Sequence, residues 1–341
     1  MHSHVRPVQP SPPPSVRNLP TQALGGRVPE PVDLRAAYGF ARGLAEVLPR
    51  PAHAGHRLVW IRRTSFSTAV LPAVPDAFLV AGRHSACDAC LVEDPSVALR
   101  HVLVRSLALP SGGVALRVVD LHTGTGFRLE DGSIQSSMLA EGPVAFAVGE
   151  FALVALPLSS SSSDDEPLPD ELPRVVHEAS LVAREQLEAL AVAMSPYRAN
   201  ARHGHRSSRI TRLPMPSFVG DPPAPSVGRL AGGRFTVTVR RGDAEASLSL
   251  TEEDLVRGVI LGRSERCVSE SLRRVTEMGT SRVHLLLVRE GSEIHAYDLA
   301  STQGTFLGPK RVRRARLPER GATMLILGNT SEAVQLTWRA L

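Results

Sequence analysis

The chain has 341 residues, enough for two ordinary domains and linkers, and its 27 glycines and 27 prolines indicate that part of it is turn-rich or unfolded. The net charge is +5; residues 229–341 alone carry +5 and residues 56–157 carry −1, a distribution that suits an anionic ligand as well as an ordinary soluble surface. Three cysteines are too few for a disulfide framework, no apolar run reaches the roughly 20 residues of a membrane span, and the first residues lack the apolar core of a signal peptide, so we expect a soluble, cytoplasmic protein.

Residues 1–55 are predicted to be a Pro-rich, disordered segment with one short helix. Prolines recur throughout residues 1–32, and each of them removes a backbone donor that a helix or sheet would use. The pattern DLRAAYGFARGLAEVL over residues 33–48 predicts an amphipathic helix, with Asp33 as its N-cap.

Residues 56–157 consist of short β-rich runs that are separated by turns. Examples are RLVWIRR, RHVLVRSL and FAVGEFALVAL. Runs of this length at short spacing predict a β-sandwich or a barrel. The first folded domain is therefore placed at residues 56–157.

Residues 158–228 are predicted to be a linker, partly helical and partly disordered. The consecutive serines Ser159–Ser163 and the acidic residues after them indicate solvated chain. An apolar seam with steps of three and four residues predicts a helix at about 171–194, which packs on a neighbouring domain or, as the less favoured alternative, dimerises. The arginines of residues 196–212 are typical of a solvated tail, because only Tyr197 supplies the aromatic stacking that a nucleic-acid contact would use.

β-rich runs resume in residues 229–341, the second predicted domain, and they repeat the landmarks of the first. Chance is a poor explanation for ordered matches at near-equal spacing. The separation between the arginine and the last glycine differs by one residue between the copies (83 to 149, and 263 to 328). The matching landmarks are Gly82-Arg83, His101, Asp120-Leu121, Gly126 and Gly149 in the first copy, and Gly262-Arg263, His284, Asp298-Leu299, Gly304 and Gly328 in the second.

The second copy carries a pattern in three parts, which reads ILGRSERC, then TSRVH, then YDLASTQGTFLG. At these residues the chain resembles the forkhead-associated (FHA) family, over about residues 235–338 in the second copy and 57–156 in the first. The resemblance implies an all-β fold made of two antiparallel β-sandwiches, each with its ligand loops at one end. It also implies that the second copy binds a phosphothreonine peptide.

The chemistry of a phosphothreonine explains the residue types in this pattern. The group carries about −1.5 to −2 charges and three acceptor oxygens at neutral pH, so its site needs a planar donor fork, a hydroxyl donor and a rigid frame. Arg263 supplies a guanidinium that matches phosphate bidentately, and Ser281 resembles the family serine that contacts the phosphate. Ser264 and Arg282 are expected to flank the phosphate.

The third part of the pattern is expected to hold the peptide. Thr302 and Gln303 face it, and Gln303 stands where the family usually has Asn. Because the Gln amide lies one methylene further out, we expect binding to be retained with altered strength or peptide preference. His284 is expected to brace the loops by hydrogen bonds rather than to titrate. The residues expected to fix the loops are Gly262, His284, Gly304 and Thr305.

The first copy is expected to be degenerate as a phosphopeptide site. It keeps Arg83 and His101, but Ala98 stands at the serine position and Thr125-Gly126 at the position of the amide and its glycine. The loss of a hydrogen bond to a charged group costs about 1.5–3 kcal/mol, which is tenfold or more in affinity. We predict weak or no phosphopeptide binding by this copy, and a structural role or a different protein contact for it.

The sequence favours neither an enzyme nor a metal or cofactor site. It contains no Walker loop, dinucleotide fingerprint or nucleophile elbow. Cys87 and Cys90 have the spacing of a zinc or redox pair, but no second pair completes a tetrahedral set and Cys267 is remote in the sequence. We interpret these cysteines as structural.

Two functions from different classes remain. The first is a phosphothreonine-dependent adaptor in Ser/Thr kinase signalling, whose partner is a phosphorylated kinase or kinase substrate. The second is a phospho-independent scaffold that uses its sandwiches and linker helix as assembly parts. A further hypothesis is that the linker itself is phosphorylated and docks on the second domain, because Ser207 and Thr211 lie among arginines. Membrane and nucleic-acid partners are not expected.

Overall fold

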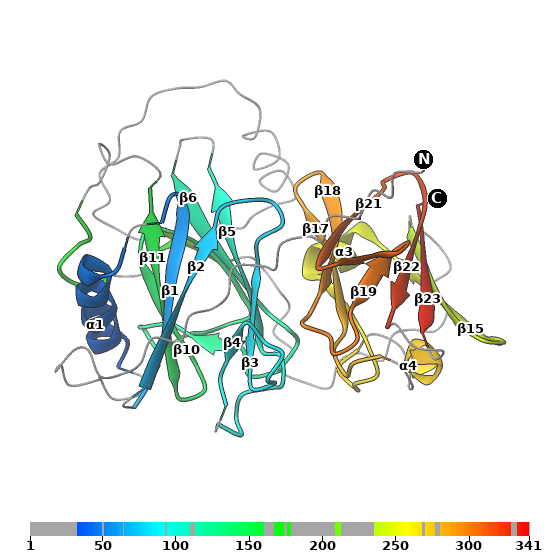
Figure 1. The fold of residues 1–341 in the computed structure, drawn as a ribbon, viewed down its shortest axis with the longest axis horizontal. Helices are drawn as coiled ribbons and strands as arrows, with labels where there is room; N and C mark the ends of the chain where they lie inside the picture. The colour runs from blue at the N-terminus through cyan, green and yellow to red at the C-terminus, as the bar shows by residue number, and fades with distance from the viewer. Residues whose placement is uncertain are drawn as a thin grey trace, which may run out of the picture.

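The computed structural model describes residues 33–49, 51–63, 65–92, 94–109, 113–159, 167–173, 176–178, 209–212, 235–267, 270–276, 280–328 and 333–340. They form two β-sandwiches that lie side by side, one built from residues 55–158 and the other from residues 235–340 (Figure 1). The predicted all-β fold of antiparallel sheets is confirmed. Residues 1–32, for which the sequence predicts disorder, lie outside the described residues.

The first sandwich contains two sheets that enclose one apolar core. Its strands are β1 (Gly55–Arg62), β2 (Ser65–Pro72), β3 (Leu79–Gly82), β4 (Ala89–Cys90), β5 (Val102–Ala108), β6 (Val114–Asp120), β7 (Phe127–Arg128), β8 (Ile134–Gln135), β9 (Ser137–Glu141), β10 (Val144–Val148) and β11 (Phe151–Leu158). One sheet has the order β2-β1-β11-β10-β7-β8, and the other contains β9-β6-β5-β3-β4.

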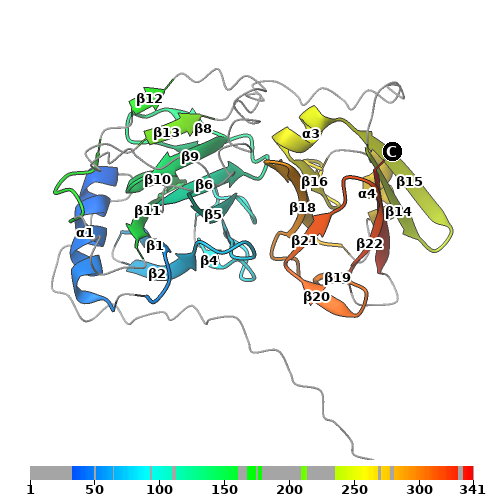
Figure 2. The ribbon, with the colours of Figure 1, turned by 90° about the horizontal axis from the view of Figure 1, so that it is seen from above.

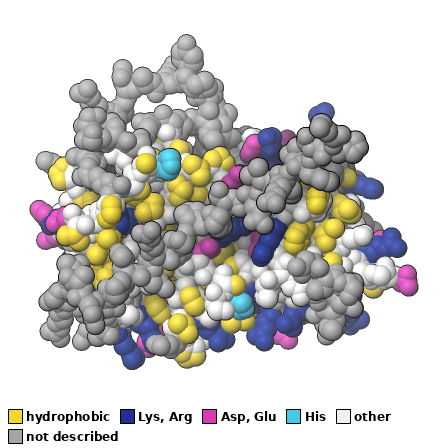
Figure 3. All heavy atoms as spheres, in the orientation of Figure 1, with side chains coloured by type: hydrophobic (Ala, Val, Ile, Leu, Met, Phe, Trp, Pro, Cys, Tyr) yellow, Lys and Arg dark blue, Asp and Glu magenta, His cyan; other side chains and the backbone are white. Residues whose placement is uncertain are grey.

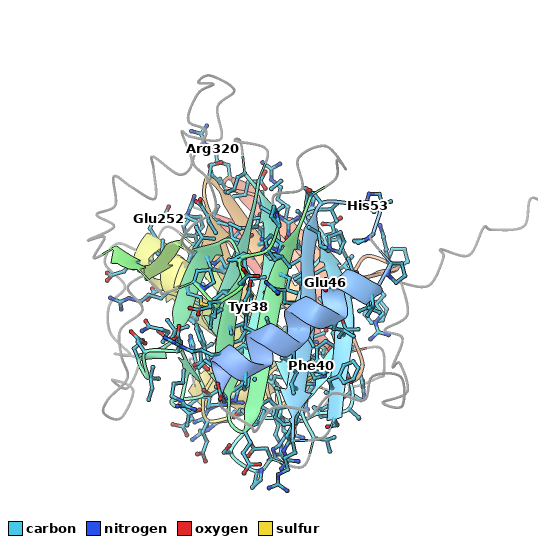
Figure 4. The ribbon with its side chains drawn as sticks, turned by 90° about the vertical axis from the view of Figure 1, so that its left-hand side faces the viewer. Tyr38, Phe40, Glu46, His53, Glu252 and Arg320 are labelled. Atoms are coloured by element: carbon cyan, nitrogen blue, oxygen red, sulfur yellow. The ribbon has the colours of Figure 1, made fainter. Side chains whose placement is uncertain are left out.

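Helix α1 (Leu34–Val47) covers the outer face of the sheet that contains β1, β10 and β11 (Figure 4). Asp33 begins this helix as its N-cap, because its carboxylate accepts a hydrogen bond from the amide of Ala36 (2.9 Å). The sheet is thus covered on both faces, which explains why β1 and β11 are nearly continuous buried runs rather than alternating ones.

The segment 167–173 returns over α1, where the Tyr38 hydroxyl donates to the carbonyl of Pro169 (2.8 Å) and Leu172 is buried. We expect Tyr38→Phe to lower the free energy of unfolding by about 1 kcal/mol, the net value of one such hydrogen bond, in urea titrations followed by circular dichroism. An unchanged midpoint would show that this segment does not stay on the helix in solution.

The linker departs from its predicted structure where the structure describes it. Residues 171–173 are not helical, and Val176–Glu178 form strand β12 instead of part of a helix. β12 pairs in parallel with β13 (Arg209–Arg212), which pairs in turn with β9. β13 pairs with the open edge of β9, and Val176–Glu178 find their backbone partners in β13, so the helix predicted at these residues is wrong. The rest of the predicted helix lies outside the described residues.

The second sandwich repeats the two-sheet plan. Its elements are β14 (Phe235–Arg241), β15 (Ala244–Leu250), α3 (Glu252–Arg257), β16 (Val259–Leu261), α4 (Glu270–Thr276), β17 (Leu285–Glu290), β18 (Glu293–Asp298), β19 (Thr305–Leu307), β20 (Lys310–Val312), β21 (Arg314–Leu317), β22 (Gly321–Leu327) and β23 (Val334–Ala340). The sheet orders are β15-β14-β23-β22-β19-β20 and β16-β17-β18-β21. Trp338 lies at the centre of the core, where it stacks on Phe235 (centroids 5.0 Å apart) and donates to the Pro318 carbonyl (2.9 Å).

The two sandwiches pack against each other through the sheet of β3, β5 and β6 and the sheet of β16, β17 and β18 (Figure 2). We call this contact the inter-sandwich interface. Its buried apolar side chains are Phe78, Val80, Cys87, Leu103 and Leu121 from the first sandwich, and Ile260, Cys267, Val283, Leu286, Val288, Tyr297 and Leu299 from the second. Because these positions are buried on the outer faces of both sheets, the sandwiches form one continuous body rather than two domains joined only by a linker.

Polar groups at the inter-sandwich interface are paired across it. Arg105 of the first sandwich forms an ion pair with Glu290 and donates to the Tyr297 hydroxyl (2.5 Å). Burial opposes ionisation of Glu290, but the Arg105 charge holds the pKa of this carboxyl below its ordinary value. Towards the edge, Arg313 pairs with Asp88 (2.7 Å). Arg105 and Glu290 are thus buried as a pair, as a stable contact requires.

Candidate functional site

The candidate site is formed by three loops at one end of the second sandwich: residues 262–267 after β16, residues 280–284 before β17, and residues 299–304 between β18 and β19. The first two loops are joined by their backbones, since the amide of Arg263 donates to the Ser281 carbonyl (3.3 Å) and that of Ser264 to the Arg282 carbonyl (2.9 Å). A Cβ atom on Gly262 would lie 2.5 Å from the Arg282 carbonyl oxygen, so this close approach requires glycine.

The Arg263 side chain is exposed at this end, and its position is fixed by one hydrogen bond. Its Nε donates to the carbonyl of Thr280 (3.2 Å). Its terminal nitrogens make no hydrogen bond or ion pair with the residues that the structure describes. Arg263 therefore presents a guanidinium fork to solvent beside Ser281.

The Ser281 hydroxyl connects the second loop to the third. Its oxygen accepts a hydrogen bond from the amide of Thr302 (3.0 Å), which leaves the hydroxyl proton available to a ligand oxygen. Ser281 is half-buried and Thr302 is exposed, so both line the outer surface of the site. The geometry brings Arg263, Ser281 and Thr302 together at one end of the sandwich.

The buried ring of His284 joins the second loop to the third by hydrogen bonds. Its Nδ1 accepts from the amide of Ser281 (3.1 Å), and its Nε2 lies 3.2 Å from the carbonyl of Gly304. These partners require a neutral ring that carries its proton on Nε2. Burial lowers the pKa of His284 to about 4, although the nearby Asp298 carboxylate opposes this shift, so the ring is neutral at physiological pH.

The third loop is held by the buried carboxylate of Asp298. It accepts from the Ser301 amide (2.8 Å), the Ser301 hydroxyl (2.6 Å) and the Thr305 hydroxyl (2.7 Å). The Ser301 hydroxyl in turn accepts from the amide of Gly304 (3.0 Å), whose φ of +86° favours glycine. Asp298 and Ser301 were not predicted as site residues, although the Asp-Leu-x-Ser part of the pattern contains both.

The remaining predicted residues also lie at these loops. Ser264 is half-buried and Arg282 is exposed. Gln303 is half-buried, and its side-chain Oε1 is buried without a hydrogen bond to any residue that the structure describes. A buried acceptor of this kind costs free energy unless a ligand donates to it. Gln303 therefore keeps one unsatisfied acceptor, which a ligand donor reaches only when the side chain turns outward.

One further cation lies at the site and was missed by sequence reasoning. A Cβ atom on Gly304 would lie 2.5 Å from Nε of Arg311, so the exposed Arg311 side chain crosses the backbone of this loop. Arg311 comes from β20, and the β19–β20 hairpin folds it back onto the loop that precedes it. Lys and Arg side chains gather at this lower end of the second sandwich in Figure 3.

The first sandwich preserves the frame of the site and the exposed Arg83, but it lacks the serine hydroxyl and the amide side chain. The amide of Arg83 donates to the Ala98 carbonyl (3.0 Å), the amide of Ala98 donates to Nδ1 of His101 (3.1 Å), and Nε2 of His101 lies 2.8 Å from the Gly126 carbonyl. Gly126 also has a positive φ, of +61°. The bonds of the arginine amide and of the histidine ring thus recur in both copies, but Ala98 has no hydroxyl and Thr125 has no amide.

The cysteines belong to the packing of the two sandwiches. Cys87 and Cys267 occupy equivalent buried positions, and burial raises the pKa of their thiols to about 12 and about 11. Cys90 is half-buried. Within the described ranges, no three His, Cys, Asp or Glu side chains are grouped as a metal site would require.

Three buried histidines and the half-buried His122 make the stability of the protein depend on pH. Burial lowers the pKa of His284, His295 and His122 to about 4 and that of His56 to about 3, below the ordinary value near 6.5 of an unfolded chain. The unfolded state therefore binds more protons below pH 6.5, and stability is lost as the pH falls from 6.5 towards 4. We expect urea unfolding to give a lower free energy at pH 5.5 than at pH 7.5, with a smaller fall for His56→Gln. Equal values at the two pH values would contradict this prediction.

A family model for the FHA domain matches residues 259–321, which contain all three loops of the site. Similar solved structures include the first FHA domain of Rv1747 from Mycobacterium tuberculosis (23% identity, TM-score 0.23, covering 31% of this chain and 97% of that one). They also include the FHA domain of yeast Dun1, determined with a doubly phosphorylated peptide derived from Rad53 (16% identity, TM-score 0.26, 36% and 91%). No curated protein shows significant similarity to the chain.

Within the part of the chain that the structure describes, no helix is both long and apolar enough to span a bilayer. The family model covers the Gly262-Arg263 turn, the Ser281–His284 segment and the Asp298–Thr305 loop, which are joined to one another by hydrogen bonds. The C-terminal sandwich of this chain is an FHA domain.

Proposed function

We propose that the C-terminal FHA domain binds a phosphothreonine peptide, and that the chain serves as an adaptor in Ser/Thr kinase signalling. The observation that carries the proposal is the convergence of the Arg263 guanidinium, the Ser281 hydroxyl and the buried acceptor of Gln303 at one end of one sandwich. The first two are donors for phosphate oxygens, and the third is an acceptor for peptide backbone.

The electrostatics of the site support an anionic ligand. Arg263, Arg282 and Arg311 are all exposed there, and none of them forms an ion pair with a carboxylate of the described residues. Like charges that lie close together repel one another, and a bound anion relieves this repulsion. Guanidinium groups match phosphate bidentately, so a phosphorylated side chain satisfies them better than a single carboxylate.

The experiment that tests this proposal separates the adaptor from the phospho-independent scaffold. The full chain is titrated with a library of peptides in which a central threonine is either phosphorylated or unmodified. The proposal predicts binding of phosphorylated members only, and loss of the captured peptide after phosphatase treatment. Equal binding of both forms would favour the scaffold.

We expect Arg311 to contribute to the choice of flanking residues. Its guanidinium lies over the 302–304 turn, where residues next to the phosphothreonine would pass. Arg311→Ala is expected to weaken binding of a peptide with acidic flanking residues by about two- to fivefold, the range of an exposed charge pair, and to leave a peptide with neutral flanks unchanged. Fluorescence anisotropy at low and high salt measures both.

The matched control is Arg320→Ala. Arg320 is exposed and lies beyond β21, at the opposite end of β18 from Asp298, because Leu317 of β21 pairs with Ile294. Equal losses in the two variants would show that Arg311 acts only through the net charge of the domain.

A further inference from the structure

All three ligand loops of the FHA domain lie against the first sandwich, since Val283 of the 280–284 loop also belongs to the apolar cluster of the inter-sandwich interface. Leu299, at the start of the 299–304 loop, and Cys267, at the end of the 262–267 loop, belong to the apolar cluster of the inter-sandwich interface. Leu121 and Cys87 stand at the equivalent positions of the first sandwich and belong to the same cluster. The loops that carry Arg263 and Thr302 are therefore packed against another body rather than free.

Arg100 of the first sandwich makes the most direct contact with these loops. Its side chain is 2% exposed, and it donates from Nε to the Leu299 carbonyl and from a terminal nitrogen to the Ala300 carbonyl (2.6 Å). Its charge also faces the carboxylate of Asp298. A buried guanidinium is costly to leave unpaired, so these bonds fix the position of the two carbonyls.

The backbone at this contact needs to be held. Ala300 has a φ of +53°, in the left-handed region that residues with a Cβ atom rarely adopt. Ser301, Thr302 and Gln303 follow directly. A contact that fixes Ala300 therefore sets the direction in which the peptide-facing residues leave the sheet.

Arg266 of the second sandwich lies within electrostatic reach of the equivalent loop of the first. It lies three residues after Arg263, it is half-buried, and the carboxylate whose charge acts on it is Asp120 of the first sandwich. Its charge also acts on His122, which burial keeps neutral. The loop of Arg263 thus packs on the first sandwich through Cys267 and carries, in Arg266, a charge that acts on the equivalent loop of the first copy.

From these contacts we infer that the first sandwich positions the ligand loops of the FHA domain, with Arg100 and Arg266 as positioning residues. The inference rests on the proposed phosphothreonine binding. Loops that are already ordered lose less conformational entropy when a peptide binds, so the affinity of the second copy depends on the first. This assigns a role to a copy that keeps the frame of the site but has Ala98 and Thr125 in place of the serine and the amide side chain.

The matched pair for the test is Arg100→Met and Arg105→Met, in the full chain. Both arginines are buried in the inter-sandwich interface (2% and 4% exposed), but the hydrogen bonds of Arg105 go to Glu290, Tyr297 and Pro75 and to no ligand loop. We expect Arg100→Met to weaken binding of a phosphothreonine peptide about tenfold and Arg105→Met to change it less than twofold. Arg266→Ala, whose side chain is only half-buried, is expected to weaken it about threefold and provides the test if Arg100→Met does not fold.

Amide hydrogen exchange of residues 299–304 gives a second readout that needs no ligand. Exchange is expected to be faster in Arg100→Met and unchanged in Arg105→Met. Equal effects of the two variants on both readouts, or tighter peptide binding by Arg100→Met, would overturn the inference; tighter binding would mean that the contact obstructs the site. If the wild-type chain binds no phosphothreonine peptide, the proposed function fails, while the exchange result still decides whether Arg100 holds the loop.

Discussion

Arg263→Ala is expected to weaken binding of a phosphothreonine peptide by at least about a hundredfold. The exposed guanidinium can donate two charge-assisted hydrogen bonds to the phosphate, and each is worth about 1.5–3 kcal/mol. The loss of both therefore removes about 3 kcal/mol or more, which is two orders of magnitude in the dissociation constant. Isothermal titration calorimetry with a single phosphorylated peptide measures this change.

The chain supplies its own matched control for this variant. Arg83 is exposed, occupies the equivalent position in the first sandwich and makes the equivalent backbone contact with Ala98. Arg83→Ala is expected to leave the affinity within twofold of wild type, because Ala98 and Thr125 offer the phosphate and the peptide no donor side chains of the required kind. Similar losses in the two variants would mean that the first copy also binds, and the assignment of the site to the second would be wrong.

Asp298→Ala is expected to abolish peptide binding and to destabilise the second sandwich by about 3–5 kcal/mol. The substitution leaves three donors without their acceptor, namely the amide and hydroxyl of Ser301 and the hydroxyl of Thr305. Each buried donor without a partner costs about 1–3 kcal/mol. The 299–304 loop then loses the geometry that presents Thr302 and Gln303, so stability and binding fall together.

The control for Asp298→Ala is the equivalent substitution in the first sandwich, Asp120→Ala. Asp120 accepts from the amide (2.8 Å) and hydroxyl of Thr123, in the same turn of the first sandwich. We expect Asp120→Ala to destabilise the chain while weakening peptide binding far less than Asp298→Ala does. Urea unfolding and calorimetry on the same samples separate the two effects. Retained peptide binding in Asp298→Ala would contradict the role given to the loop.

The fold and the positions of the three candidate loops could be predicted from the sequence because local signals and the repeat agree. The landmarks from Gly262-Arg263 to Gly328 recur in the order of those from Gly82-Arg83 to Gly149. A turn that needs a positive φ is also recognisable in the sequence by its glycine, as at Gly304 and Gly126. The spacing of the pattern Ser-x-x-His also has a physical reason, because the ring of His284 accepts a hydrogen bond from the amide of Ser281, three residues before it.

The contacts that were not predicted depend on tertiary structure. Arg311 reaches the site only because the β19–β20 hairpin folds back onto the 299–304 loop. Arg100 reaches that loop only because the two sandwiches pack through their outer sheet faces. The run LLLV of β17 is the sequence signal for this interface. A strand with one solvent-exposed face alternates apolar and polar residues, whereas β17 is apolar at four successive positions, as a strand covered on both faces is. The error at β12 has a similar origin: a weak helical seam was overridden by the open edge of a sheet.

The central claim is that the guanidinium of Arg263 and the hydroxyl of Ser281 bind the phosphate of a phosphothreonine. A crystal structure of the full chain with a phosphothreonine peptide tests it most directly. We expect phosphate oxygens at about 2.7–3.0 Å from both groups, with the peptide backbone against Gln303. A phosphate found at the Arg83 loop of the first sandwich, or a peptide that binds with its phosphate in solvent, would contradict the claim.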